Sequence, residues 1–274
     1  MTRTRFFLAV AALALLVSAV THGARADSAA DKAAEEAAKA EAKALAERLG
    51  DKERAVREEA LVEAKANQHP LVTAALVKRL GDDFFELRET AIEALATREA
   101  EACKRGAAQA LGARLAKVPG GDRLEERLLV IDALRRLAQV NSLKALADDI
   151  DIKMDAEELG ARTMAIANVP DAKAIELLID LRARAGRGAA NEANRGATLL
   201  RRALTSAIGQ DLGGDTDAWR IWWKDNKKDF DFAAAAERRR AAEEKADQRE
   251  ARLEERKEKR KKKRDGEEGG SSTD

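Results

Sequence analysis

One stretch of helical sequence occurs twice in this chain, and this repetition constrains the fold more than any other feature. Residues 49–66 read LGDKERAVREEALVEAKA, and residues 80–97 read LGDDFFELRETAIEALAT. When the two are aligned, Leu-Gly-Asp falls on Leu-Gly-Asp, a Val-Arg pair falls on a Leu-Arg pair, and the apolar residues that follow keep their spacing. The period of about 31 residues lies near that of helical repeats, in which each unit stacks on the next.

The composition favours helices throughout. Asp, Glu, Lys and Arg make up 37% of the 274 residues, alanine and leucine dominate the apolar set, and there is no tyrosine. Ala, Leu, Glu, Lys and Arg are strong helix formers, whereas strand formers are too sparse here for a large sheet. The formal net charge of +1 argues neither for nor against an anionic partner. We therefore expect an all-α protein.

The N-terminus has the pattern of a secretory signal peptide over residues 1–26. Two arginines form a basic start, residues 6–20 form an apolar run, and residues 24–26 form an A-x-A cleavage site. The apolar run is short for a membrane-spanning helix, which needs about 20 residues. We expect a periplasmic or secreted protein that starts at Asp27, and a membrane-anchored one if the signal is not cleaved.

The repeats predict pairs of antiparallel helices joined by short turns. Gly50 and Gly81 suit the left-handed position after a helix, and Asp51 and Asp82 can then cap the next helix N-terminus. Pro70 is well placed in the first turn of a further helix. On each second helix the apolar residues share one face, and the small alanines allow neighbouring helices to approach closely.

The pattern Gly-Asp, then Val-Arg or Leu-Arg, then Ala-Leu or Ala-Ile resembles HEAT-repeat proteins. In that family an arginine of the second helix forms a ladder with an aspartate of the turn. Asp51 with Arg57 matches this pattern, and Asp82 with Arg88 matches it with Leu87 in place of the valine. A planar guanidinium at a packed seam can satisfy turn carbonyls and a carboxylate together. The resemblance implies an α-solenoid, an ARM-type superhelix of about four to five antiparallel helix pairs.

Later units keep the arginine but lose parts of the pattern. Arg127 and Arg162 fall in the same frame as the earlier arginines, although Glu126 stands where the valine is expected. A longer turn at VPGGD, residues 118–122, explains the wider spacing before Arg127. The resemblance is specific for architecture and says nothing about activity.

The repeats also divide the chain into segments. Residues 171–186 and 190–208 suggest a fifth, degenerate helix pair, and an alanine-rich stretch before the first repeat predicts a helix from about Asp31. We expect a signal peptide, an Ala-rich helical lead-in, the repeat array, a Trp-rich closing segment and a charged tail, over residues 1–26, 27–44, 45–208, 209–232 and 233–274.

The segment after the array carries all three tryptophans. Trp219, Trp222 and Trp223 are spaced i, i+3 and i+4, so they share one face of a short helix that Asp215 or Thr216 caps. This helix is similar to the closing segment of secreted bacterial HEAT-repeat proteins. It either closes the last open face of the array or presents an aromatic patch to a partner. Calcium binding by the nearby aspartates is disfavoured, because their spacing fits no EF-hand.

The tail is highly charged, and Leu253 is almost its only large apolar residue. It cannot bury a core, so a solvated helix and a disordered segment both stay open. Residues 256–264 hold eight basic residues of nine, which suits either a solvating tail or an electrostatic tether for an anionic surface. The run closes with Lys261, Lys262, Lys263 and Arg264.

No motif in the chain indicates an enzyme. It lacks G-x-S-x-G, H-E-x-x-H, a phosphate-binding glycine loop and paired cysteines, and the lone Cys103 predicts a small buried side chain. We expect no cofactor and no metal. The best interpretation is a monomeric, non-catalytic interaction scaffold with an unknown protein partner. The alternative is binding of an anionic polymer or membrane surface through the tail, and the second alternative is an enzyme or enzyme subunit of unknown reaction.

Overall fold

The structure is a computed structural model that describes residues 28–121, 123–150, 154–186 and 195–268; of residues 28–30, 186, 243, 250 and 260–268 it describes the backbone alone. These residues form twelve α-helices and one short 3-10 helix, and no strand occurs among them. The all-α class predicted from the composition is therefore confirmed. The expected signal peptide, residues 1–26, lies outside the described residues.

The chain divides into two compact units, Met1–Ala44 and Leu45–Asp274. The described part of the first unit is the alanine-rich stretch of helix α1 (Ser28–Leu49), whose side chains from Asp31 to Glu41 are all exposed. Alanine has little apolar area to bury, so this stretch depends on helix propensity for its stability. The two leucines in the last turns of α1 belong to the second unit and are buried.

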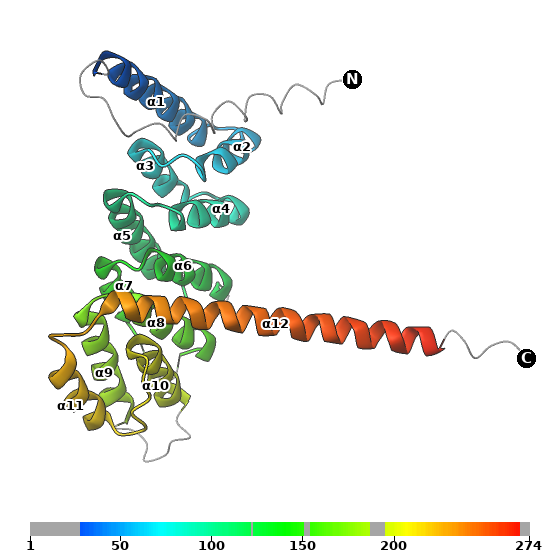
Figure 1. The fold of residues 1–274 in the computed structure, drawn as a ribbon. Coiled ribbons are helices and arrows are strands. Elements are labelled where there is room, and N and C mark those ends of the chain that lie inside the picture. The colour runs from blue at the N-terminus through cyan, green and yellow to red at the C-terminus, as the bar shows by residue number, and fades with distance from the viewer. Residues whose placement is uncertain (1–27, 122, 151–153, 187–194, 269–274) are drawn as a thin grey trace, which may run out of the picture. The chain divides into compact units, whose positions relative to one another are not determined.

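The second unit consists of helices that follow one another in pairs (Figure 1). We call one set the second helices: α2 (Arg54–Ala64), α4 (Phe85–Ala96), α6 (Leu124–Leu137), α8 (Ala156–Asn168) and α10 (Arg195–Ile208). We call the other set the first helices: α3 (Pro70–Arg79), α5 (Glu101–Lys117), α7 (Leu143–Ala147, directly after the 3-10 helix η1, Val140–Ser142) and α9 (Ala172–Gly186). Two more helices follow: α11 (Thr216–Asn226) and α12 (Phe232–Glu268).

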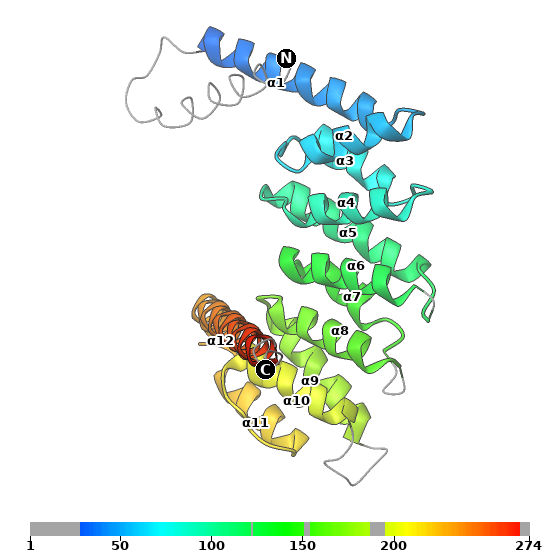
Figure 2. The same ribbon diagram turned by 90° about the vertical axis from the view of Figure 1, so that its right-hand side faces the viewer.

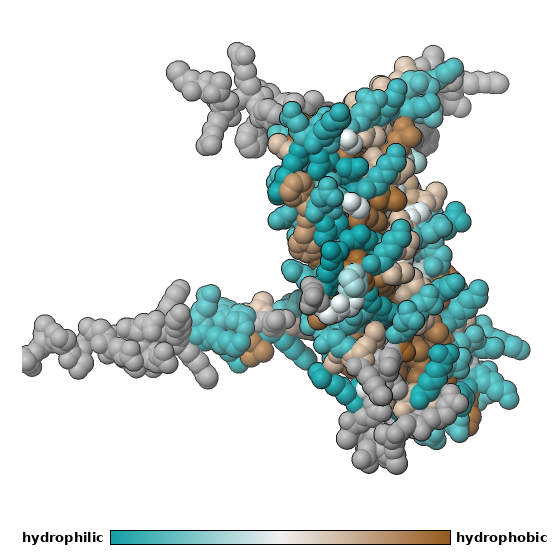
Figure 3. Space-filling view, turned by 180° about the vertical axis from the view of Figure 1, so that it is seen from behind, coloured by the Kyte–Doolittle hydropathy of each residue, from teal (hydrophilic) through white to brown (hydrophobic). Residues whose placement is uncertain are grey.

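Helices pack on one another in the order in which they occur in the sequence. Each second helix contacts the next, so α2, α4, α6, α8 and α10 form one row (Figure 2), and the first helices α3, α5 and α7 form another. From α3 and α4 onward, each first helix also packs on the second helix of its pair. Figure 3 shows mostly hydrophilic residues on one face, with hydrophobic residues in the seams between helices. Each pair thus buries its apolar residues by stacking on its neighbours.

The helix ends at the first two turns differ from the prediction. Gly50 and Gly81 do not adopt a left-handed backbone. Each donates its N–H to the carbonyl three residues back, at 2.9 Å and 3.3 Å, so a tight 3-10 turn ends the helix. The left-handed position occurs instead at Ala138, which follows α6 with a φ of 51°. A glycine in the sequence marks a turn, but its neighbours in the fold decide which turn forms.

The aspartates of these turns lie too early in the sequence to act as N-caps. Asp51 accepts from the N–H of Glu53 at 2.8 Å, and Asp82 from the N–H of Phe84 at 3.3 Å. Glu53 and Phe84 are themselves the N-cap residues of α2 and α4. The aspartates therefore close the turn before the helix rather than cap the helix itself. The prediction for Pro70 is confirmed, because it is the first residue of α3.

Helices α5 and α7 approach each other closely at Gly112. A Cβ added to this glycine would lie 2.9 Å from the Cβ of Ala145 on α7, which is too close for two packed carbons. Helix α7 has only five residues, so it has few other side chains with which to hold its place. The lack of a side chain at position 112 therefore sets the distance between these two first helices.

We predict that Gly112→Ala lowers the free energy of unfolding by about 1 kcal/mol or more, because the added methyl group overpacks the contact with Ala145. The matched control is Gly106→Ala in the same helix, where an added Cβ meets nothing within 4 Å. The control should gain about 1 kcal/mol, because alanine is the better helix former. Urea unfolding followed by circular dichroism measures both. A Gly112 variant that gains as much as the control would contradict the close approach.

Candidate functional site

Arginines on the second helices join each turn to the next. Arg57 on α2 is 8% exposed, and its Nη1 donates to the backbone carbonyls of Asp51 and Lys52, both at 3.0 Å. Its Nε donates to the carboxylate of Asp82, in the following turn, at 2.9 Å. One side chain therefore holds the turn before its own helix and the turn of the next pair, which fixes how the two pairs stack.

The structure corrects the pairing expected from the sequence. Asp51 contributes its carbonyl oxygen to Arg57, and the carboxylate partner of Arg57 is Asp82. Likewise Arg88 binds the carbonyl of Asp82 at 2.9 Å, and its carboxylate partner is Glu126 on α6, at 3.0 Å. The carboxylate of Asp51 accepts a backbone N–H of its own turn. The guanidinium instead meets the carboxylate that stacking brings to it from the next pair.

Glu126 is a residue of this network that sequence reasoning missed. It occupies a position where an apolar residue is expected, yet it is 2% exposed and accepts from both Arg88 and Arg114. Burial acts to raise the pKa of Glu126, but the hydrogen bonds from the two arginines outweigh it and hold the pKa below its ordinary value. The sequence does contain a signal for this contact: Glu126 stands at a position of the repeat that is otherwise apolar. A carboxylate buried there needs a cationic partner.

The same arrangement continues on α8. Glu158 is 4% exposed and accepts from Arg127 at 2.6 Å and from Arg162 at 2.9 Å. Each of these arginines also donates to two backbone carbonyls ahead of its own helix. We call the whole network the ladder, and its members are Arg57, Arg79, Asp82, Arg88, Arg114, Glu126, Arg127, Glu158 and Arg162.

Two further arginines, also missed from the sequence, are buried against backbone carbonyls. Arg98 is 2% exposed and donates to Ala64 and Lys65, at the end of α2, and to Ala94 in α4. Arg182 is 4% exposed and donates to carbonyls of the loop before α11. A helix C-terminus carries partial negative charge, which suits a cation. Burial lowers the pKa of both guanidinium groups. These arginines stabilise the fold, so a binding surface has to come from exposed side chains.

From α2 to α8, the exposed charges separate between the two sets of helices, whereas α10 carries three arginines and no acidic residue and α9 carries both signs. Outside the ladder, α2, α4, α6 and α8 carry nine acidic side chains and only three arginines, all exposed or half-buried. The first helices α3, α5 and α7 carry five basic side chains and one acidic one outside the ladder. We call the acidic set the acidic face, and its members are Glu58, Glu59, Glu63, Glu86, Glu89, Glu93, Glu125, Asp132 and Glu157.

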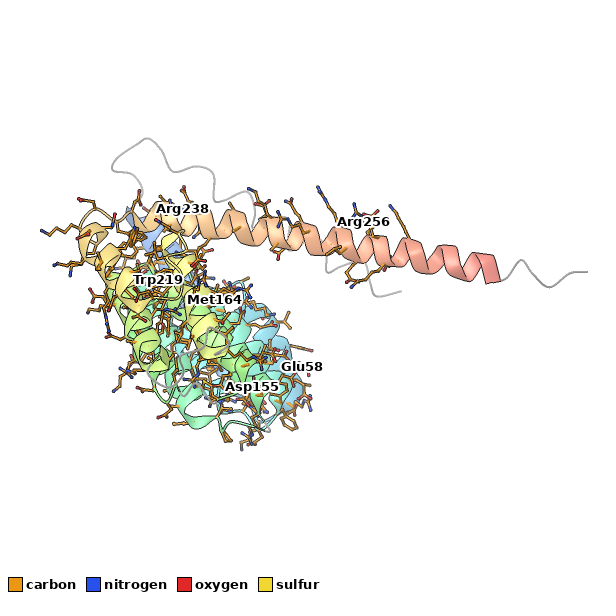
Figure 4. The ribbon with its side chains drawn as sticks, turned by 90° about the horizontal axis from the view of Figure 1, so that it is seen from below. Glu58, Asp155, Met164, Trp219, Arg238 and Arg256 are labelled. Atoms are coloured by element: carbon orange, nitrogen blue, oxygen red, sulfur yellow. The ribbon has the colours of Figure 1, made fainter. Side chains whose placement is uncertain are left out.

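Part of the acidic face is already paired. Glu63 binds Arg48 and Glu93 binds Lys65, both at 2.5 Å, while Asp132 binds two arginines of its own helix. Glu86 also lies 3.6 Å from Arg54. Among the described residues, no ion-pair partner is found for the other five: Glu58, Glu59, Glu89, Glu125 and Glu157. In Figure 4, Glu58 lies at the edge of the packed helices. These carboxylates are the charges available to a partner.

A groove of about 470 Å³ opens on this face at α6 and the start of α8. We call it the second-helix groove. Three half-buried leucines form its floor and three acidic residues form its rim. The floor is Leu124, Leu128 and Leu129, and the rim is Glu125, Asp132 and Glu157. An apolar floor with a carboxylate rim suits a basic segment that carries an apolar side chain.

The first helices carry a groove of different character. It has a volume of about 780 Å³ and spans α5, η1, α7 and α9. Its lining mixes apolar side chains such as Val140 and Leu177 with Arg105 and Lys144, and with Glu101 and Asp148. Both signs of charge occur together here, so this groove selects no partner charge as clearly as the acidic face does.

The three tryptophans do not form an exposed patch. Trp219 is 1% exposed and Trp223 is 4% exposed, while Trp222 is half-buried and stacks on Trp223 with ring centroids 6.5 Å apart. Helix α11 packs on α9, and Trp223 Nε1 donates to Glu176 there at 3.4 Å. Asp215 caps α11, as predicted. Of the two roles that the sequence left open, the burial of Trp219 and Trp223 by their own chain, which Figure 4 shows for Trp219, favours packing within the fold over an aromatic patch for a partner.

The charged tail forms the long helix α12, so the helical alternative is the one observed. Its base packs on α10, where Ala235 is 2% exposed and Arg239 donates to the carbonyl of Ala207 at 3.2 Å. These contacts anchor the beginning of the helix. The tail is therefore joined to the last second helix through its first two turns.

Beyond this base, every described side chain from Arg240 to Lys259 is exposed, including Leu253 at 55%. Glu255 and Lys259, four residues apart, form an ion pair at 2.5 Å. Within the described part of the chain no helix, α12 included, is both long and apolar enough to cross a membrane. The backbone of α12 is described past the basic run, as far as Glu268. The side chains of Lys261, Lys262, Lys263 and Arg264 lie outside the described part of the structure.

Three further titratable groups, His69, Cys103 and Asp211, have structural surroundings that explain them. His69 caps α3, with Nδ1 accepting from the N–H of Leu71 at 3.2 Å, and Cys103 is buried as predicted. Asp211 binds Arg201 at 2.7 Å, and this hydrogen bond lowers the pKa of Asp211 to about 2. Across the described ranges, no group of three or more His, Cys, Asp and Glu side chains could hold a metal ion.

We predict that Glu126→Gln lowers the free energy of unfolding at pH 7 by about 3 kcal/mol, because it leaves Arg88 and Arg114 without their shared counter-charge. The matched control is Glu125→Gln, one residue away and exposed, which should stay within about 0.5 kcal/mol of the wild type. Urea unfolding at several pH values measures both.

The same variant tests the pKa of Glu126. Because the folded-state pKa lies below that of the unfolded chain, the carboxylate stabilises the fold above about pH 4.3. This contribution is lost as the pH falls through the lower folded-state pKa. The gap between the wild type and Glu126→Gln should therefore narrow in acid. A gap that stays constant from pH 7 to pH 3 would contradict the ion pair.

Neither of two comparisons with known proteins finds a match. A scan against protein-family models matches no part of the chain, and a search of curated proteins finds no similar one. An assignment of function therefore rests on the contacts and charges of the described residues.

Proposed function

We propose that this chain is a HEAT-like α-solenoid that serves as an exported, non-catalytic interaction scaffold. The row of second helices from α2 to α10 supports a solenoid, because each one packs on the next. The ladder supports the HEAT-like type, because Arg57, Arg88, Arg127 and Arg162 each bind preceding carbonyls and a carboxylate. Export rests on the signal-like sequence of residues 1–26.

The observation that carries the binding proposal is the acidic face. Nine acidic side chains lie on four neighbouring helices with three arginines among them, so the surface attracts a basic polypeptide and repels anionic polymers. The ladder holds these helices at fixed spacing. The carboxylates are therefore preorganised, and a partner that binds them loses less entropy than it would on a flexible surface.

We predict that poly-L-lysine binds the full chain more tightly than poly-L-glutamate does, and that binding weakens as salt is raised, because exposed charges are screened beyond about 8 Å at physiological ionic strength. The triple variant Glu58→Lys, Glu59→Lys and Glu89→Lys should weaken poly-L-lysine binding by about tenfold or more. Fluorescence anisotropy of the labelled polymer measures the affinity.

The matched control reverses three exposed charges on the first helices: Lys78→Glu, Lys117→Glu and Lys144→Glu. It changes the net charge by the same amount in the opposite sense, so it should not weaken the binding of poly-L-lysine. Equal binding of the polymer by the acidic-face variant and the wild type would refute this binding surface.

The alternative function is attachment of α12 to an anionic polymer or membrane surface. One observation favours it: the described side chains of α12 beyond its base are all exposed, and the sequence continues into the basic run of residues 256–264. A basic segment held away from other helices can reach a surface freely.

If that alternative holds, replacing Lys261, Lys262, Lys263 and Arg264 by Gln in the full chain should abolish co-sedimentation with phosphatidylglycerol vesicles, because each cation near an anionic surface contributes about 1 kcal/mol. Neutral phosphatidylcholine vesicles are the control. Binding that persists in the neutralised variant would assign it to another part of the chain.

A further inference from the structure

We propose that the occupant of the second-helix groove is helix α12 of a second copy of this chain. The proposal deepens the function above and rests on it, since it takes one particular basic segment as the partner of the acidic face. The groove and the helix complement each other in charge, in apolar content and in spacing.

The groove has what a basic helix with one apolar residue needs. Its leucine floor is half-buried, and two of its three rim carboxylates, Glu125 and Glu157, have no ion-pair partner among the described residues. Asp132 accepts from Arg135 at 3.0 Å and from Arg136 at 2.7 Å. A carboxylate offers about four acceptor sites, so Asp132 can take a further arginine at the groove.

Helix α12 carries the matching side chains. Leu253 is its one large exposed hydrophobic residue, at 55%. Arg249 and Arg256 lie four residues before it and three after it, so all three share one helix face. Residues 249–264 hold ten basic and four acidic side chains. A leucine exposed on so polar a helix is the natural contact for an apolar floor.

The spacings agree. Arg249 and Arg256 are seven residues apart with Leu253 between them, and Glu125 and Asp132 are seven residues apart on α6 with two of the floor leucines, Leu128 and Leu129, between them. Seven residues span about 10 Å in either helix. When α12 lies along α6, both arginines reach a rim carboxylate while Leu253 enters the floor, as in near-parallel helix packing.

The occupant comes from another copy because α12 is anchored in its own chain. Ala235 and Arg239 hold its base on α10, and the helix runs without a break to Glu268. Leu253 lies fourteen residues beyond Arg239, about 21 Å along the axis, and its described neighbours are all exposed. In Figure 4, Arg256 likewise lies far along α12 from that base. Docking in the same chain would require the helix to break.

The consequence is a reversible, salt-sensitive self-association. One leucine and a few exposed ion pairs give a weak contact, so the monomer expected from the sequence is the form at low concentration. If two copies exchange tails reciprocally, the contact is made twice and the dimer gains by avidity.

The test is sedimentation velocity of the full chain over a concentration series in 50 mM and 500 mM NaCl. The wild type should form dimers at the higher concentrations in low salt and dissociate in high salt. Leu253→Asp should raise the dimer Kd by about tenfold, as should Glu125→Arg with Glu157→Arg. Circular dichroism checks that each variant remains helical.

Two further variants make the test specific. Combining Glu125→Arg and Glu157→Arg with Arg249→Glu and Arg256→Glu reverses the arginines of α12 and the two unpaired rim carboxylates but leaves Asp132 unchanged. It should therefore bring the dimer Kd back below that of the groove variant alone. The control is Glu58→Arg with Glu59→Arg, which reverses acidic-face charges outside the groove and should leave the dimer Kd unchanged. Dimers that respond equally to the groove variant and to this control would overturn the proposal.

Anisotropy with labelled poly-L-lysine separates this proposal from the function on which it rests. If the wild type binds poly-L-lysine but stays monomeric at every concentration, the groove does not take α12, and the proposed function stands. If the chain binds no poly-L-lysine and forms no dimer, both fail. A monomer that instead co-sediments with phosphatidylglycerol vesicles through α12 would assign the tail to a membrane surface and overturn the proposal.

Discussion

The rest of the structure depends on a buried guanidinium that binds backbone carbonyls and a carboxylate at the same time. A buried ion pair alone loses about as much by desolvation as it gains by attraction, unless further hydrogen bonds satisfy its donors. Arg57 meets this condition, since Nε, Nη1 and Nη2 all donate. Its carbonyl partners belong to one turn and its carboxylate partner, Asp82, to the next. Arg57, Arg88 and Arg127 thus each set the position of two neighbouring helix pairs, which apolar packing between alanine-rich helices would leave loosely defined.

The ladder also shapes the surface. It places its own charges in the seams between the stacked helices and leaves the exposed positions from α2 to α8 free to carry opposite signs on the two sets of helices. Acidic residues gather on α2, α4, α6 and α8, and basic residues on α3, α5 and α7. Opposite charges on separate rows produce a directional field without changing the net charge of +1. A basic partner would be drawn to one row, and the proposed contact with α12 uses that same attraction.

In the C-terminal part, α11 packs on α9, and α12 carries exposed charged side chains beyond its anchored base. The aromatic residues of α11 are used to cover α9, so they stabilise the fold and leave little aromatic surface for a partner. Directly after them α12 is anchored on α10 by its first turns and then carries only exposed described side chains. Stability is concentrated at the base of this helix, and the charge that could bind a partner lies beyond it.

The sequence by itself determined the all-α class, the helix pairs and four of the six ladder arginines, because helix propensity and periodic spacing are local properties of the chain; Arg79 and Arg114 were missed. It also indicated that Pro70 begins a helix and that Cys103 is buried. Only the tertiary structure decided that Arg57 takes the carboxylate of Asp82, that Glu126 and Glu158 complete the ladder, and that Trp219 and Trp223 are covered while Leu253 is not. Partners brought together by stacking lie as many as 38 residues apart, and no local pattern specifies which of two nearby carboxylates meets an arginine once the helices have packed.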